Sequence, residues 1–225
     1  MTLQEKLDAF KADFEANKAP AVAIEAFHRS IHELIQNKSA EQALQAGDRA
    51  PEFRLFDSDG NLVSSRALLN KGPLVVTFYR GVWCPYCNFD LQALEEVADE
   101  IRSRGASLLA ISQQGALSSR KSKRDNNLSY PILIDQGGKL AQSYDLRWTL
   151  PSYLIEVFKM FKVDLLKIHH DDKWTLPMPA RYIIDRDGII AYAEVNPDYT
   201  QRPEPSDLFP ILDQLAIQKR YASSR

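Results

Sequence analysis

The sequence predicts an α/β domain with a mixed β-sheet, preceded by a helical extension. Three observations lead to this class. Short β-branched and aromatic runs alternate with segments of helical periodicity, a tight turn joins the last two runs, and the first 46 residues carry only helical patterns. The chain of 225 residues is long enough for one large domain with an appendage.

The N-terminal lead is predicted to be helical. Thr2 with Glu5 matches a capping box, and apolar residues then recur at three- and four-residue steps. Pro20 interrupts this stripe before a second one begins. We expect the lead, residues 1–46, to pack on the main domain, residues 47–225, or on a second subunit, which leaves a homodimer open.

The main domain opens with a predicted β-hairpin around the turn signal Asp59-Gly60. Strands are expected where buried β-branched runs end at Gly, Pro or Asp, and helices where apolar residues recur with helical spacing. A dense apolar set over 151–161 predicts a helix against the site or against a partner. The expected strands are 53–55, 62–63, 74–79, 107–112, 131–135, 180–184 and 189–195. The expected helices are 3–14, 24–34, 65–69, 85–104, 118–127, 139–144, 151–161 and one from about Ser206, with a helical turn from Ser39.

The turn between strand 74–79 and the following helix is the chemically informative stretch. It contains both cysteines of the chain, Cys84 and Cys87, separated by Pro85 and Tyr86. Pro85 suits the first helical position, so Cys84 is the expected N-cap and Cys87 falls within the first turn. The unpaired N–H groups and the positive dipole end of a helix stabilise a thiolate there, and the spacing permits a disulfide. Either one cysteine attacks and the other resolves, or the pair shuttles between dithiol and disulfide.

The composition argues against several classes of function. A formal net charge of -2 gives no electrostatic case for nucleic acid or an anionic membrane. No apolar run approaches the length of a bilayer span, and the N-terminus lacks a signal-peptide core, so we expect a cytoplasmic protein. A lone Cys-X-X-Cys supplies two zinc ligands where a structural site needs four, so neither a metal nor another cofactor is expected. In a reducing compartment such a pair is more often catalytic than structural.

Four stretches of the main domain resemble one known family. Residues 47–53, the Asp59-Gly60 turn, the Cys-X-X-Cys motif and residues 182–188 are similar to the peroxiredoxin-like branch of the alkyl hydroperoxide reductase and thiol-specific antioxidant family. The resemblance, over about 47–217, implies a thioredoxin-like mixed sheet flanked by helices. It also implies a peroxidase that reduces hydrogen peroxide or small organic hydroperoxides, recycled by a thiol reductant such as thioredoxin or a glutaredoxin system.

The resemblance implies roles for individual residues. Cys87 stands at the position of the family's peroxidatic cysteine, and Cys84 replaces the family's threonine and would resolve the sulfenic acid. The family's later arginine falls on Pro179, so we expect Arg80 or Arg181 to supply the cationic partner of the thiolate.

The same positions leave two other functions open. Cys84 and Pro179 are what thioredoxin-type oxidoreductases have, and Cys-Pro-Tyr-Cys is the glutaredoxin signature, so Cys84 could instead attack a disulfide first. A cis bond before Pro179 would then shape a groove for an extended substrate. Trp83 and Tyr86, together with Arg80 and Pro179, are the expected substrate contacts. The third function is a non-catalytic binding domain that docks a partner through its helical lead.

Overall fold

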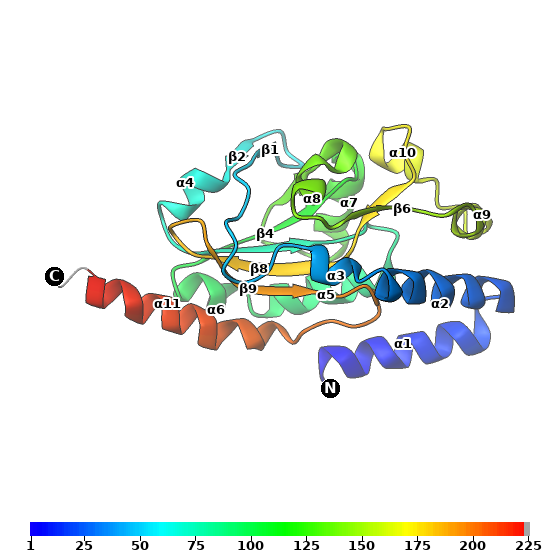
Figure 1. Ribbon diagram of the computed structural model, residues 1–225, viewed down its shortest axis with the longest axis horizontal. Helices are drawn as coiled ribbons and strands as arrows, with labels where there is room; N and C mark the ends of the chain where they lie inside the picture. The colour runs from blue at the N-terminus through cyan, green and yellow to red at the C-terminus, as the bar shows by residue number, and fades with distance from the viewer. Residues whose placement is uncertain (223–225) are drawn as a thin grey trace.

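A five-stranded mixed sheet lies at the centre of the computed structural model, which describes residues 1–222 and their side chains to Ile217 (Figure 1). Its strands, in spatial order, are β5 (Ile132–Ile134), β4 (Ser107–Ser112), β3 (Leu74–Phe78), β8 (Ala180–Ile184) and β9 (Ile190–Val195). The first three run parallel, and β8 and β9 pair antiparallel to their neighbours. The mixed sheet predicted from the sequence is confirmed.

Both faces of the sheet are covered, because the central strands are apolar on both sides. Val75 of β3 enters the core with α5 (Pro85–Glu96), α6 (Ala98–Ser103) and α11 (Leu208–Ala222). Val76 and Phe78 enter the opposite core with α4 (Ser65–Leu69) and α8 (Lys139–Ser143). Figure 1 shows α6 and α11 below the sheet and α4 and α8 above it. The carboxyl end of β3 therefore delivers the chain directly into α5.

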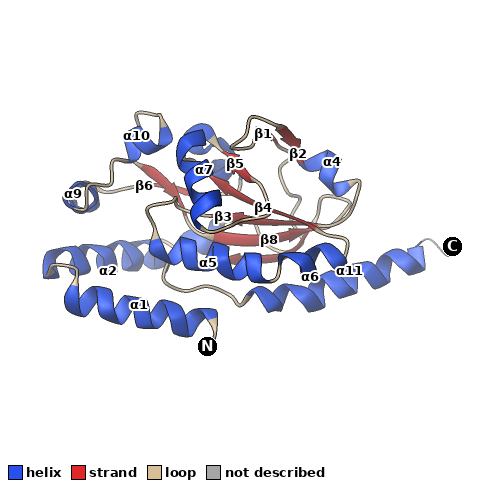
Figure 2. Ribbon diagram, turned by 180° about the vertical axis from the view of Figure 1, so that it is seen from behind, coloured by secondary structure: helices blue, strands red, loops and turns tan. Residues whose placement is uncertain are grey.

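The predicted helical lead packs on the main domain. Thr2 and Glu5 form the expected capping box, with Thr2 Oγ1 accepting from Glu5 N at 3.2 Å. Leu3 and Leu7 are buried in the core that α5 shares. The lead consists of α1 (Leu3–Asn17), α2 (Ala21–Gln36) and α3 (Ser39–Gln42). Helix α1 lies along α5, and α2 contacts α9 (Ser152–Met160), which is seen nearly end-on while α2 runs across the view (Figures 1 and 2). The division into residues 1–46 and 47–225 stays a prediction, and its last three residues lie outside the described part.

The remaining elements agree with the sequence except at three places. The predicted helix 85–104 is divided at Val97, where φ is -114° and ψ is 9°, so that both halves keep their apolar face on the sheet. Strands β6 (Arg147–Thr149) and β7 (Thr175–Pro177) form a short antiparallel pair, and α10 (Leu165–His169) precedes β7. These short elements carry no alternation for the sequence to show. The other elements are β1 (Arg54–Phe56), β2 (Leu62–Ser64), α7 (Ala116–Asp125) and the 3-10 turns Gln136–Gly138 and Pro205–Asp207.

The length and apolar character that a membrane-crossing helix requires are not combined in any helix of residues 1–222.

Candidate active site

The turn between β3 and α5 places two thiols at the start of a helix. Cys84 is the N-cap of α5 and Pro85 is its first residue, as the sequence predicts. Both cysteines are free, and Cys84 is 1% and Cys87 0% exposed. Gly81 has a φ of +147°, and a Cβ there would lie 2.6 Å from Trp83 Nε1, so the turn requires glycine. Its carbonyl accepts from Cys84 N at 3.1 Å and closes the turn.

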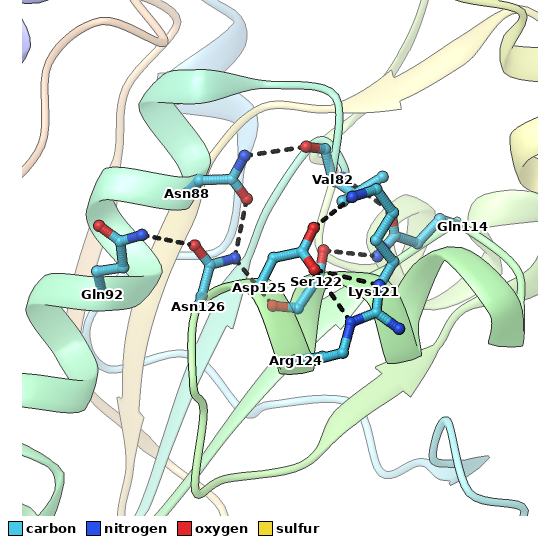
Figure 3. A network of polar contacts seen from close by, with 9 residues as sticks. All are labelled: Val82, Asn88, Gln92, Gln114, Lys121, Ser122, Arg124, Asp125 and Asn126. Atoms are coloured by element: carbon cyan, nitrogen blue, oxygen red, sulfur yellow. Dashed lines mark hydrogen bonds and ion pairs between the residues drawn. The ribbon is translucent and has the colours of Figure 1, made fainter.

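A polar network holds this turn between two helices (Figure 3). Asn88 of α5 donates to Val82 O at 2.9 Å, and Asn126, after α7, donates to Asn88 Oδ1 at 3.1 Å. Gln114 accepts from Val82 N at 2.9 Å and donates to Tyr79 Oη at 2.6 Å. Because both backbone groups of Val82 are bonded to side chains, the turn keeps one geometry and the sulfurs keep their positions.

Cys87 faces a buried group of charges. The Arg202 guanidinium lies 3.7 Å from Cys87 Sγ, and its Nε lies 3.7 Å from an oxygen of Asp90. Arg181 binds the other oxygen of Asp90 and donates to Pro203 O at 3.1 Å. We call Asp90, Arg181 and Arg202 the charged cluster. Two arginines against one carboxylate leave a positive charge, and a buried positive charge stabilises a neighbouring thiolate.

The two thiols differ in pKa. Burial, followed by the hydrogen bond with Cys87, raises the pKa of Cys84 well above its ordinary value. Burial also acts to raise the pKa of Cys87, but the hydrogen bond from Cys84 and the charges of Arg202 and Arg80 outweigh it, and the pKa falls to about 6. Near neutral pH the pair therefore shares one proton, which resides on Cys84 and leaves the negative charge on Cys87.

Cys84 faces a cavity of about 250 Å³. Eight of its twelve lining residues are aromatic. Helices α1 and α2 contribute the rings of Phe10, Phe14 and Phe27. The other rings are those of Trp83, Tyr86, Phe158, Phe161 and Tyr199. We call this space, with Cys84 and Arg80 in its wall, the aromatic cavity. Its wall is mostly apolar, and the one charged side chain among its described lining residues is that of Arg80.

The family of the chain follows from residues 46–193, which match the AhpC/TSA family. The chain belongs to the AhpC/TSA family. Among its relatives, the chloroplastic peroxiredoxin Q of Oryza sativa subsp. japonica is 27% identical over 146 residues, which are 65% of this chain and 57% of that protein. The chain thus spans little more than half the length of this relative. The thiol-disulfide oxidoreductase ResA of Bacillus cereus is 20% identical over 151 residues, 67% of this chain and 69% of that protein.

Solved structures agree with a thioredoxin-like fold of the peroxiredoxin type. The peroxidoxin BcpB from Mycobacterium tuberculosis aligns with a TM-score of 0.59 at 20% identity, over 76% of this chain and 96% of that one. The peroxiredoxin 6 of Arenicola marina aligns with a TM-score of 0.60 at 16% identity, over 78% of this chain and 75% of that one. The predicted fold class and the resemblance are confirmed.

The structure brings most of the expected site residues together. Arg80, Trp83 and Tyr86 line the aromatic cavity beside Cys84. Pro179 does not line it, but borders a small hollow shared with Arg181 and Arg202. The peptide bond before Pro179 is trans, as are all others in the described part of the chain. Three of the four residues expected to contact substrate thus surround one cavity, and the substrate-binding role of all four stays a prediction.

The cationic partner of the thiolate is only partly the one that the sequence predicts. Arg80 lowers the pKa of Cys87, but Arg181 binds Asp90 and Pro203 instead of sulfur. Arg202 is the guanidinium bonded to Cys87, and it lies outside the segment that matches the AhpC/TSA family. It is 115 positions from Cys87, in a loop between prolines, where no local pattern distinguishes it from a solvated arginine.

No three His, Cys, Asp or Glu side chains of the described residues gather closely enough to hold a metal ion.

Proposed function

We propose that this chain is a thiol peroxidase that reduces hydrogen peroxide or small organic hydroperoxides, with Cys87 attacking and Cys84 resolving. The unequal pKa values of the two thiols carry the proposal, because a peroxidase needs one thiolate and one proton donor side by side. Membership of the AhpC/TSA family supports it.

The first step consumes the shared proton. The Cys87 thiolate attacks the terminal peroxide oxygen, so that an S–O bond forms as the O–O bond breaks. The proton of Cys84 goes to the leaving alkoxide, or to hydroxide when the substrate is hydrogen peroxide, and an alcohol or water departs. Cys87 is then a sulfenic acid and Cys84 a thiolate, which is the state that the second step needs.

The second step closes the disulfide. The Cys84 thiolate attacks the Cys87 sulfur, an S–S bond forms, and hydroxide leaves Cys87 and takes a proton from solvent. Two thiols have then been oxidised to one disulfide and one peroxide reduced by two electrons. A dithiol reductant, such as thioredoxin or a glutaredoxin system, would return the pair to thiols by attack at Cys84. The reductant, a cytoplasmic location and a homodimer are parts of this proposal.

A stopped-flow titration of the reduced protein with hydrogen peroxide tests the proposal. Trp83 adjoins the motif, so we expect its fluorescence to change during the reaction. We expect two thiols to be lost per peroxide, at a rate well above that of a free thiolate of matched pKa. Loss no faster than this reference would exclude the peroxidase.

One observation favours a second function, thiol-disulfide exchange led by Cys84. Cys84 lines the aromatic cavity, whereas Cys87 does not. In this function Cys84→Ser abolishes the reduction of a test disulfide such as insulin. The peroxidase predicts instead that dimedone traps a sulfenic acid in Cys84→Ser and none in Cys87→Ser.

A further inference from the structure

Four of the eight rings of the aromatic cavity come from outside the matched AhpC/TSA segment. Phe10, Phe14 and Phe27 come from the N-terminal helices, and Tyr199 comes from the loop after β9. Neighbouring rings pack on one another, with Phe27 stacked on Phe161 at 6.1 Å between centroids. Half of the aromatic wall is thus supplied by segments that the family match does not include.

The size of the cavity limits its occupant. A cavity of about 150 Å³ with apolar walls already holds a benzene molecule. The aromatic cavity measures about 250 Å³ and therefore has room for one ring with a short substituent. Hydrogen peroxide would leave nearly all of this apolar surface uncovered.

Arg80 provides the polar end of the cavity. It is only 5% exposed, its Nε has no hydrogen-bond partner, and no carboxylate of the described residues pairs with it. Its guanidinium instead lies over the Tyr199 ring at 3.8 Å and near the Trp83 ring at 4.9 Å. A buried cation that no carboxylate of the described residues neutralises, placed beside Cys84, favours an acceptor group such as a peroxide oxygen at that end.

We propose that the aromatic cavity binds the organic part of the peroxide and selects hydroperoxides that carry one aromatic ring. This inference rests on the proposed peroxidase. The ring lies among the aromatic side chains, and the peroxide group lies at the end formed by Arg80 and Cys84, whose thiol is hydrogen-bonded to Cys87. Phe27 and Phe161 are then specificity residues, although neither touches sulfur.

Rapid kinetics with three peroxides tests the selection. We expect cumene hydroperoxide to react about tenfold or more faster than tert-butyl hydroperoxide and hydrogen peroxide. Val163→Phe, which fills the cavity, is expected to remove most of this preference, while the matched control Phe209→Leu on α11 retains it. Equal rate constants for the three peroxides in the wild type would overturn the inference and leave the peroxidase intact.

A binding measurement separates the cavity from the chemistry. The variant with both Cys84→Ser and Cys87→Ser cannot react, and we expect 2-phenyl-2-propanol, the alcohol product, to quench its Trp83 fluorescence saturably. Val163→Phe in the same background should weaken this binding about tenfold. If no binding is seen in the serine variant, the aromatic cavity is not the ligand site, whatever the activity of the wild type.

A separate set of contacts joins α1 to the segment that carries Arg202. Glu204 Oε1 accepts from Leu3 N at 2.7 Å and from Gln4 N at 3.3 Å, at the start of the helix. The Gln4 side chain accepts from Arg202 N at 3.0 Å and donates to Thr200 O at 3.2 Å. Gln4 thus binds the backbone of both neighbours of Gln201.

The geometry points to Gln4 as a positioning residue that keeps Arg202 against the Cys87 sulfur. The first turn of α1 is fixed by the buried Leu3 and Leu7, so a rigid element carries the glutamine. Without Gln4, the loop loses two backbone partners next to Arg202 while the guanidinium keeps its ion pair with Asp90. The N-terminal helix is then part of the site that activates Cys87.

The pH dependence of iodoacetamide alkylation, measured in Cys84→Ser protein, tests this role. We expect Gln4→Leu to raise the midpoint for Cys87 by about half a pH unit, and Gln4→Glu, which keeps the acceptor for Arg202 N, to recover part of the shift. Asp13→Asn, on the exposed face of the same helix, is the control. In protein that already carries Arg202→Met, Gln4→Leu should no longer shift the alkylation midpoint of Cys87. A midpoint unchanged in Gln4→Leu would overturn the inference.

Discussion

The two sulfurs of one helical turn face two unlike regions of the molecule. Cys87 borders the charged cluster, where two arginines outweigh one carboxylate. Cys84 borders the aromatic cavity, where the N-terminal helices contribute three of the eight rings. In the proposed peroxidase, the charged cluster determines the reactivity of the pair and the aromatic cavity determines its access.

The exclusion of water from both regions increases the difference between the two thiols. Arg202 and Asp90 are about 5% and 4% exposed at their side chains, so their charges act through little water. The same burial removes water from Cys84, which keeps its proton. One environment therefore holds a thiolate and the other a thiol, although the two residues are only three positions apart.

Cys87→Ser should have the largest effect, because it removes the thiolate. We expect the rate constant for peroxide to fall by about a thousandfold or more. Stopped-flow fluorescence measures it, with Cys84→Ser as the matched control. If Cys87→Ser kept its rate and Cys84→Ser lost it, the two regions would have exchanged their roles.

Arg202→Met removes from the charged cluster the guanidinium that lies next to Cys87. Loss of the guanidinium should raise the pKa of Cys87 from about 6, so that less thiolate is present at pH 7 and peroxide reacts about tenfold more slowly. Arg202→Lys should recover part of the rate, and Arg186→Met, at an exposed arginine, should change nothing. An unaltered rate–pH midpoint in Arg202→Met would remove this arginine from the site.

The pH profile of the wild-type rate constant tests whether the charged cluster lowers the pKa of Cys87. The pKa of Cys87 is lowered, so thiolate is present above pH 6 and is lost as the pH falls through that value. We expect the rate constant for peroxide to be level near pH 7 to 8 and to fall about tenfold per unit well below pH 6. A midpoint near the ordinary thiol value would show that the cluster does not act on Cys87.

Cys84→Ser should have the smallest effect on the first step. The hydroxyl can still donate to the Cys87 thiolate, so we expect the rate constant to fall by less than about tenfold. The stoichiometry should change from two thiols to one per peroxide, counted with a thiol reagent, because no disulfide can form. This variant has one thiol per chain, so the loss of two thiols per peroxide would indicate a disulfide between two chains and a different resolving step.

Much of the fold could be predicted because its signals are local. The run at β3 and the helical spacing after it place the cysteines at a strand-to-helix turn, and Pro85 identifies the first residue of α5. The hairpin around Gly60 follows from one turn signal. The pair β6–β7 could not be predicted in this way, since three-residue strands depend on their partner rather than on their own pattern.

The amino-acid sequence by itself determined that two thiols stand at the start of a buried helix, because capping and periodicity act between near neighbours. It did not reveal which thiol carries the charge or what each one faces. Arg202 reaches Cys87 from 115 positions away, and Phe27 reaches the aromatic cavity from a separate helix. Such contacts leave no periodic trace in the chain, because they exist only once distant segments are packed together. The tertiary structure alone therefore decided the electrostatics and the access of the site.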